Sequence, residues 1–207
     1  MRTTRSHEEF LTELAALIKK EGIASLSVAE IAARLHCSRR RLYDVAATKE
    51  GLLLEVAKWQ FQDSIEAGEK AAAAEADPAR RLRAYLGAGL RAAETLGTGF
   101  LADLQQSDEG RALFDEFQLT RSKGAREILE AGARIGEFKA VNFDIVTEVL
   151  LGAASRLRNA DFLRRANLTI PEAFGEAYEL VLQGLLVQTG EAQHRPVKAK
   201  LTASHVR

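Results

Sequence analysis

Three consecutive arginines, Arg39–Arg41, follow Ser38 and precede Tyr43, and this cluster is the part of the sequence best suited to recognising an anion. Guanidinium groups are permanent cations whose planar N–H donors pair with phosphate oxygens and with the exposed edge of guanine. From Arg34 to Lys49 there are five basic residues against one acidic residue, whereas the whole chain is neutral, with 29 of each. This local charge predicts a nucleic-acid contact, because DNA binding needs a basic patch and not a basic whole.

Two short helices joined by a tight turn are expected to carry these side chains. Ser27 opens a capping box, with a glutamate three residues later, and a helix of about two turns follows. Residues 36–37 then form the turn, and Ser38 caps a second short helix that covers residues 39 to about 45. Leu42 is expected to anchor this second helix inward while its arginines face outward, as a helix-turn-helix requires.

The rest of the chain is also typical of helices, because apolar residues recur at three- and four-residue spacing and no alternating strand pattern persists. The sequence therefore predicts an all-α protein. Capping signals and glycines set the expected ends: the first helix starts at Ser6 and stops at Gly22, and the pair Asp77-Pro78 starts another. The later helices are expected at about residues 48–74, 78–97, 100–106, 110–135, 142–158 and 171–189.

The stretch SVAEIAARLHCSRRRLYD, from Ser27 to Asp44, and the TKEGLL that begins at Thr48 resemble the N-terminal domain of the tetracycline-repressor (TetR) family. The Ile-Ala pair, the small turn, the serine, the Leu-Tyr pair and the Thr-Lys-Glu triplet recur in that family at this spacing. The resemblance implies a three-helix helix-turn-helix domain, joined by a long helix to a helical ligand-binding and dimerisation domain. The implied division is 1–50 for DNA binding, 51–189 for ligand binding and dimerisation, and 190–207 for a flexible basic tail.

The resemblance also implies roles for individual residues. Tyr43 and Lys49 would contact DNA phosphates, and Ser27 would face the DNA backbone from a helix N-terminus. Ser38, Arg39, Arg40 and Arg41 would enter the major groove. The chain departs from the usual family pattern at three pairs, with His36-Cys37 for Gly-Val, Arg40-Arg41 for Gly-Thr or similar, and Val45-Ala46 for His-Phe. The extra arginines suggest greater reliance on phosphate or guanine contacts.

Each of these residues also has a plainer interpretation. Arg39–Arg41 is alternatively a solvated run of charge, Tyr43 a half-buried core residue, and Lys49 a free surface side chain. Cys37 is expected to pack, with a redox sensor or a metal ligand as the alternatives. No second cysteine and no histidine pair stands at ligand spacing, so no metal site is expected.

The middle helices carry apolar side chains that either line a pocket or form plain core. Their content favours a small hydrophobic or aromatic effector, and the candidates are Trp59, Tyr85, Leu86, Leu90, Phe100, Leu104, Phe114 and Phe117. The last two helices have wider apolar faces than a monomer core needs, which predicts a homodimer that places two heads on successive major grooves. The interface candidates are Phe143, Val146, Val149, Leu150, Ala153, Leu157, Phe174, Tyr178, Val181, Leu182 and Leu185.

These features together predict a ligand-responsive transcriptional regulator, a repressor released from a pseudo-palindromic DNA operator by its effector. The alternative is a helical small-molecule-binding or protein-interaction module without operator binding. An enzyme is not expected, because the histidines at 7, 36, 194 and 205 lie outside the middle helices and no Gly-rich phosphate loop or nucleophile elbow occurs. The pair Asp103 and Glu116 stays open as a catalytic alternative, although nothing singles it out. No catalytic residue and no cofactor is expected.

The sequence also bears on the compartment. A single cysteine suits a reducing cytosol, and the polar residues 1–7 contain no apolar signal-peptide core. No apolar run approaches the roughly 18 residues that span a bilayer. We therefore expect a cytoplasmic protein that does not enter the membrane.

Overall fold

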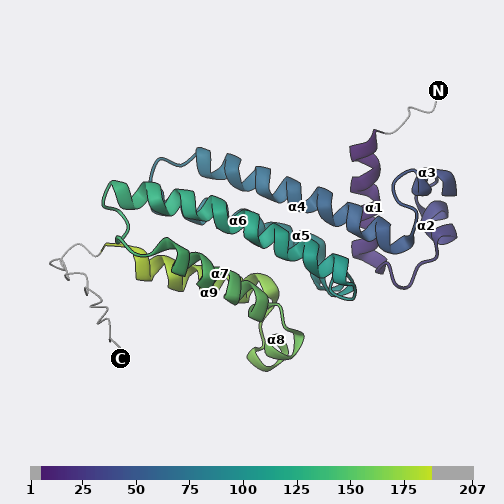
Figure 1. Ribbon diagram of the computed structural model, residues 1–207. Coiled ribbons are helices and arrows are strands. Elements are labelled where there is room, and N and C mark those ends of the chain that lie inside the picture. Colours follow the sequence, from purple (N-terminus) through teal and green to yellow (C-terminus); the bar gives the residue numbers. More distant parts are fainter. Residues whose placement is uncertain (1–5, 188–207) are drawn as a thin grey trace, which may run out of the picture.

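The computed structural model describes residues 6–187, except for the side chains at positions 93, 95–98 and 160. Over this range the chain is all-α, as predicted, and the helices form an elongated molecule with a small cluster at one end (Figure 1). The expected tail at 190–207 lies outside the described residues. The helices are α1 (His7–Glu21), α2 (Val28–Arg34), α3 (Arg39–Tyr43), α4 (Lys49–Ala73), α5 (Pro78–Leu104), α6 (Asp108–Arg134), α7 (Phe143–Leu157), α8 (Ala160–Ala166) and α9 (Ile170–Leu185).

Helices α1, α2 and α3 form the head, whose ends are fixed by the predicted caps. Ser6 and Ser27 each complete a capping box with the glutamate three residues later, and the Ser38 hydroxyl accepts a hydrogen bond from the Arg41 N–H. Each bond satisfies a backbone group that a helix end leaves unpaired, which is worth about 1 kcal/mol. Short helices such as α2 and α3 depend on such bonds, because they are below the length at which isolated helices are stable.

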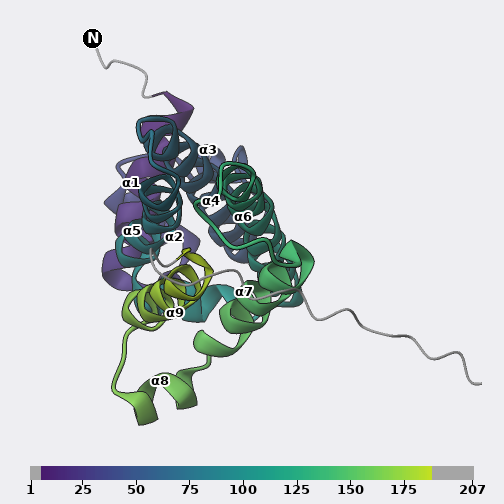
Figure 2. The same ribbon diagram turned by 90° about the vertical axis from the view of Figure 1, so that its left-hand side faces the viewer.

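The long helices α4, α5 and α6 form the body, and α7 and α9 cover it on one side (Figure 2). Thr48, Asp77 and Ser107 cap the three long helices, and Pro78 occupies the first position of α5. An isolated bridge between Phe138 and Leu186 ties the loop after α6 to the end of α9. No helix of the described range is long and apolar enough to cross a membrane.

Three expectations about the helices were wrong. Helix α5 runs unbroken from Pro78 to Leu104, where a break near residues 97–99 was expected. Glycine disfavours a helix by about 1 kcal/mol, but the buried side chains of Phe100 and Leu104 hold the last turns against the head. Helix α8, with the weak signals of an asparagine at each end, was not expected. Helix α9 ends at Leu185 because Leu186 leaves it to pair with Phe138.

The buried apolar residues form two clusters. One contains the core of the head, from Phe10 to Leu53, together with Phe61 of α4, Leu104 of α5 and Phe117 of α6. The other lies at the far end of the body, around Leu82, Leu129 and Leu182 of α5, α6 and α9. The head therefore shares its core with the near ends of the three body helices.

Candidate nucleic-acid interface and central cavity

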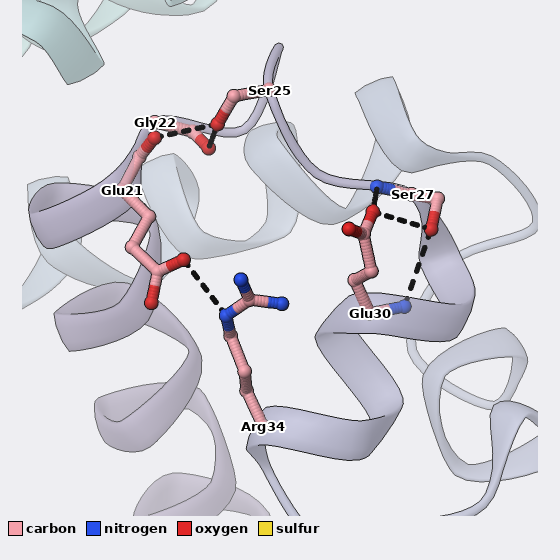
Figure 3. A network of polar contacts seen from close by, with 6 residues as sticks. All are labelled: Glu21, Gly22, Ser25, Ser27, Glu30 and Arg34. Atoms are coloured by element: carbon pink, nitrogen blue, oxygen red, sulfur yellow. Dashed lines mark hydrogen bonds and ion pairs between the residues drawn. The ribbon is translucent and has the colours of Figure 1, made fainter.

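A network of polar contacts fixes the loop between α1 and α2 (Figure 3). The Arg34 guanidinium lies 2.7 Å from a Glu21 carboxylate oxygen, and the Ser25 hydroxyl donates to the Glu21 carbonyl over 2.7 Å. The Ser27 hydroxyl donates to Glu30 over 2.7 Å, and hydrogen bonds from Ser27 hold the pKa of Glu30 below its usual value. The charge of Arg34 is thus paired within the head.

The three arginines of α3 do not share one environment. Arg39 and Arg40 are exposed, whereas Arg41 is half-buried with its guanidinium 5.1 Å from the centre of the Phe10 ring. Stacking of a cation on an aromatic ring stabilises the packing of α3 on α1. Leu42 of the same helix is fully buried, as predicted. Two arginines, and not three, are therefore presented outward.

Tyr43 is 53 % exposed, so its interpretation as a half-buried core residue is wrong. Lys49 is half-buried, and its Nζ donates to the Ala24 carbonyl over 3.2 Å. It is therefore not a free surface lysine in this structure, but two of its three N–H donors are left for other partners. Ser27 and Ser38 are exposed at the N-termini of α2 and α3, with their hydroxyls engaged in capping.

The positions where the chain departs from the usual family pattern have local structural roles. His36, where the family often has glycine, has a positive φ of 48° in the turn between α2 and α3. Cys37 is half-buried against the core of the head. A Cβ added to Gly51 would lie 2.9 Å from the Ala46 Cβ, so small residues at both positions allow α4 to approach the end of α3 closely. No group of three or more His, Cys, Asp or Glu in the described range is arranged to hold a metal ion.

A cavity of about 420 Å³, including its opening to solvent, lies between α4, α5, α6 and α9. We call it the central cavity. Of the predicted pocket residues, Leu90, Phe114 and Phe117 line it, and Phe61 stacks on Phe117 with ring centres 4.2 Å apart. The complete lining is Phe61, Gly89, Leu90, Ala92, Leu101, Phe114, Phe117, Gln118, Arg121, Ile170 and Phe174.

The other predicted pocket residues lie elsewhere. Tyr85, Phe100 and Leu104 are buried in the core, and burial raises the pKa of the Tyr85 hydroxyl. Leu86 lines a smaller neighbouring cavity of about 250 Å³, and Trp59 is half-buried against the core of the head. The sequence analysis missed Gln118 and Arg121, although both lie on the apolar stripe of α6 that contains Phe114 and Phe117.

A second connection besides α4 joins the body to the head. The Asp103 carboxylate, near the end of α5, accepts a hydrogen bond from the Ile23 N–H over 3.3 Å, in the turn after α1. Leu101, two residues earlier, lines the central cavity and belongs to the core of the head. One turn of α5 therefore contacts both the cavity and the head.

The predicted interface residues divide between the monomer core and the surface. Leu150, Phe174, Leu182 and Leu185 are buried within the chain itself, against the body helices. The others are half-buried, except Val149, which is 52 % exposed. The apolar side chains that α7 and α9 leave exposed are Val149, Ile145 and Leu180. Gly152 and Gly184, at helical spacing from them, meet nothing that would limit close approach.

Residues 10–56 match the family of bacterial regulatory proteins called the tetR family. The chain is also similar over its length to PfmR, a TetR-family transcriptional regulator from Thermus thermophilus, with 25 % identity and a TM-score of 0.59 over 84 % of this chain and 97 % of PfmR. The head of this chain therefore carries the N-terminal domain of the tetR family of bacterial regulatory proteins. The match to the family covers the head and the first turns of α4, where the exposed arginines and Tyr43 lie.

Further solved structures share the fold at lower identity. A transcriptional regulator from Cytophaga hutchinsonii has a TM-score of 0.71 at 15 % identity, over 87 % of this chain and 98 % of that one. SmeT, the repressor of the Stenotrophomonas maltophilia efflux pump SmeDEF, has a TM-score of 0.66 at 15 % identity, over 90 % of this chain and 93 % of SmeT. No curated protein sequence matches the chain. The body is therefore TetR-like in fold.

Proposed function

We propose that this chain binds operator DNA as a homodimer and represses transcription until a small molecule in the central cavity releases it. The observation that carries the proposal is the presentation of Arg39 and Arg40 on the first turn of a capped α3, which the fully buried Leu42 anchors to the core. A recognition helix needs this arrangement, because its N-terminal residues contact base edges while its apolar side holds it on the scaffold.

Tyr43 and Lys49 are proposed to contact phosphates, and Ser27 at the N-terminus of α2 is proposed to face the DNA backbone. Ser38 is proposed to enter the major groove with the arginines that follow it. Phosphate contacts fix the register of a head on DNA, whereas arginine contacts to guanine supply sequence preference. Arg41 is proposed to position α3 through its contact with Phe10.

Helices α7 and α9 are proposed to form the dimer interface through the surface defined by Ile145, Val149, Gly152, Leu180 and Gly184. Exposed apolar side chains grouped on two packed helices mark an association surface. An isologous two-fold contact would place two identical heads on one pseudo-palindromic operator. The buried Leu150 and Leu182 then support this surface from behind.

The central cavity is proposed to hold the effector, and two routes connect it to the head. Phe61 of α4 forms one wall of the cavity, and α4 begins beside α3. Leu101 of α5 forms part of another wall, and Asp103, in the same turn of α5, contacts the turn after α1 in the head. A ligand that binds better to an arrangement with displaced heads lowers the DNA-binding population.

Operator binding is tested by a gel-shift assay of the full chain with DNA from upstream of its own gene. We expect a discrete complex that tolerates at least about 1,000-fold excess of scrambled DNA, since specific sites are that much tighter than non-specific ones. Equal binding to operator and scrambled DNA would instead favour the helical module without operator binding.

The variant Tyr43→Phe tests the proposed phosphate contact. It removes one hydroxyl from an exposed ring and is expected to weaken binding to operator and scrambled DNA alike, by about tenfold or more, as the loss of one hydrogen bond to a charged group predicts. Fluorescence anisotropy on both DNAs measures the change. A loss confined to the operator would show that Tyr43 reads a base and not a phosphate.

The variant Asp103→Ala tests the route through α5. Because Asp103 accepts from the Ile23 N–H and does not line the cavity, its removal is expected to leave operator affinity and effector affinity within about threefold. It should reduce the effect of ligand on operator affinity by about five- to tenfold, within the usual range of coupling energies. Anisotropy titrations with and without effector measure both quantities, and unchanged coupling would leave α4 as the route.

A further inference from the structure

Arg121 is a buried cation on the wall of the central cavity. It is 6 % exposed and lies on the side of α6 that also carries Phe117, Ala125 and Leu129. Arginine is seldom buried to this extent unless an opposite charge compensates it, because removal of a charge from water costs several kcal/mol.

The described residues give Arg121 only neutral partners. Its Nη2 donates to the Leu86 carbonyl over 2.9 Å and its Nη1 to the Tyr178 hydroxyl over 3.4 Å. The guanidinium also lies 5.6 Å from the centre of the Phe117 ring and 6.0 Å from that of Tyr178. No carboxylate among residues 6–187 forms an ion pair with it, although other arginines of the body, such as Arg83 and Arg126, do have such partners. A guanidinium has five N–H donors, and these two bonds use two of them.

Two acidic residues act on a group beside Arg121 but form no ion pair with it. Glu69 and Glu127 both act on the neighbouring Tyr85 hydroxyl and raise its pKa, but both are exposed. Arg121 acts on the same hydroxyl in the opposite direction. The positive charge therefore lies at the cavity wall without an acidic partner among the described residues, beside the buried amide of Gln118.

The opposite wall of the cavity makes room for the guanidinium. A Cβ added to Gly89 of α5 would lie 2.1 Å from the Arg121 Cζ and 2.1 Å from its Nη1. Only glycine, which has no side chain, lets α5 lie this close to the guanidinium. The backbone of α5 therefore meets the Arg121 side chain of α6 at the cavity wall. The side chains of Phe61, Phe114 and Phe174 line other parts of the cavity.

We propose that the effector of the central cavity is a small organic anion, a carboxylate with a short apolar or aromatic body. Arg121 would pair with the carboxylate, Gln118 would donate a further hydrogen bond, and the phenylalanine side chains would surround the apolar body. The space between these side chains is about 420 Å³ when the open solvent at its mouth is included, and most of the residues that line it are apolar. The proposal rests on the proposed function, since it assumes that this cavity is the effector site.

Matched acids and amides test the charge directly on the full chain without DNA. The probes are phenylacetate with phenylacetamide, and hexanoate with hexanamide, measured by isothermal titration calorimetry. We expect each acid to bind about 10- to 100-fold tighter than its amide, as charge-assisted hydrogen bonds predict. Arg121→Met should remove the preference, and Gly89→Ala, which displaces the guanidinium, should weaken acid binding about tenfold or more. Lys123→Met removes the same charge from an exposed position of α6 and should change nothing.

A preference of less than about threefold for the acids, binding of neither acid, or an unchanged preference in Arg121→Met would each overturn the proposal. If Arg121→Met does not fold, the order of acid and amide in the unaltered protein and in Gly89→Ala decides alone. Operator release is measured separately by gel shift. Release by the amides as readily as by the acids overturns the proposal but leaves the proposed function standing. Acids that bind without releasing the operator support the proposal and contradict the ligand response.

Discussion

The double variant Arg39→Ala, Arg40→Ala is expected to lose operator affinity by about 100-fold or more. Each arginine that contacts guanine is worth about 1–3 kcal/mol of discrimination, and both are exposed on the first turn of α3. The dependence of affinity on salt should also become shallower, by about one for every phosphate that the variant no longer neutralises. Anisotropy titrations over a series of salt concentrations measure affinity and slope in one experiment.

Two consecutive exposed arginines on α8 offer a matched control. Arg164 and Arg165 are both exposed, and Figure 1 shows α8 far from α3. Arg164→Ala, Arg165→Ala removes the same charge and is expected to leave operator affinity within about threefold. If the two double variants bound the operator equally well, the exposed arginines of α3 would be a solvated charge run, and the proposed recognition helix would be wrong.

The variant Val149→Glu is expected to dissociate the dimer and, with it, operator binding. Val149 is half-exposed on α7, one turn after Ile145, and α7 packs on α9, which carries the exposed Leu180. A two-fold interface would bury the new carboxylate twice, and each unpaired buried charge costs several kcal/mol. We expect the dissociation constant of the dimer to rise by at least about 100-fold, and operator affinity to fall by a similar factor. Sedimentation velocity at micromolar concentration measures the first quantity.

The control for this variant adds the same charge to the other side of the molecule. Ala73 is exposed at the end of α4, which lies away from α7 and α9 in Figure 2. Ala73→Glu should therefore sediment as a dimer and bind the operator as before. A Val149→Glu protein that stayed dimeric would place the interface on another surface, and a chain that is monomeric before any substitution would remove it altogether.

Local signals predicted the head well because the physical causes are themselves local. The capping boxes at Ser27 and Ser6 use partners three residues away, and both are present. The helix end that was expected near Gly99 is absent because Phe100 and Leu104 pack against the head, whose residues come much earlier in the chain. No pattern within the helix reports such a contact.

The arginines illustrate the same limit at the candidate sites. The triplet in α3 predicted a basic surface, but the contact that withdraws Arg41 comes from Phe10, in another helix. Arg121 left a signal that was available in the sequence, since it is a charged residue on an otherwise apolar stripe of α6. What the sequence did not contain was the close approach of Gly89, and thus the position of the cation at a cavity wall.

The apolar cluster that joins Leu14 of α1 to Leu104 of α5 also limits how a head can be recombined with the body of another protein. A head transplanted onto a different body would bring its recognition helix but would lose the side chains of α5 and α6 that complete its core. The recipient would have to supply apolar groups of matching shape at the same places, because cores tolerate little change in volume. Changing the operator preference by substitution on the exposed face of α3 leaves that core untouched, whereas recombination near residue 50 cuts through it.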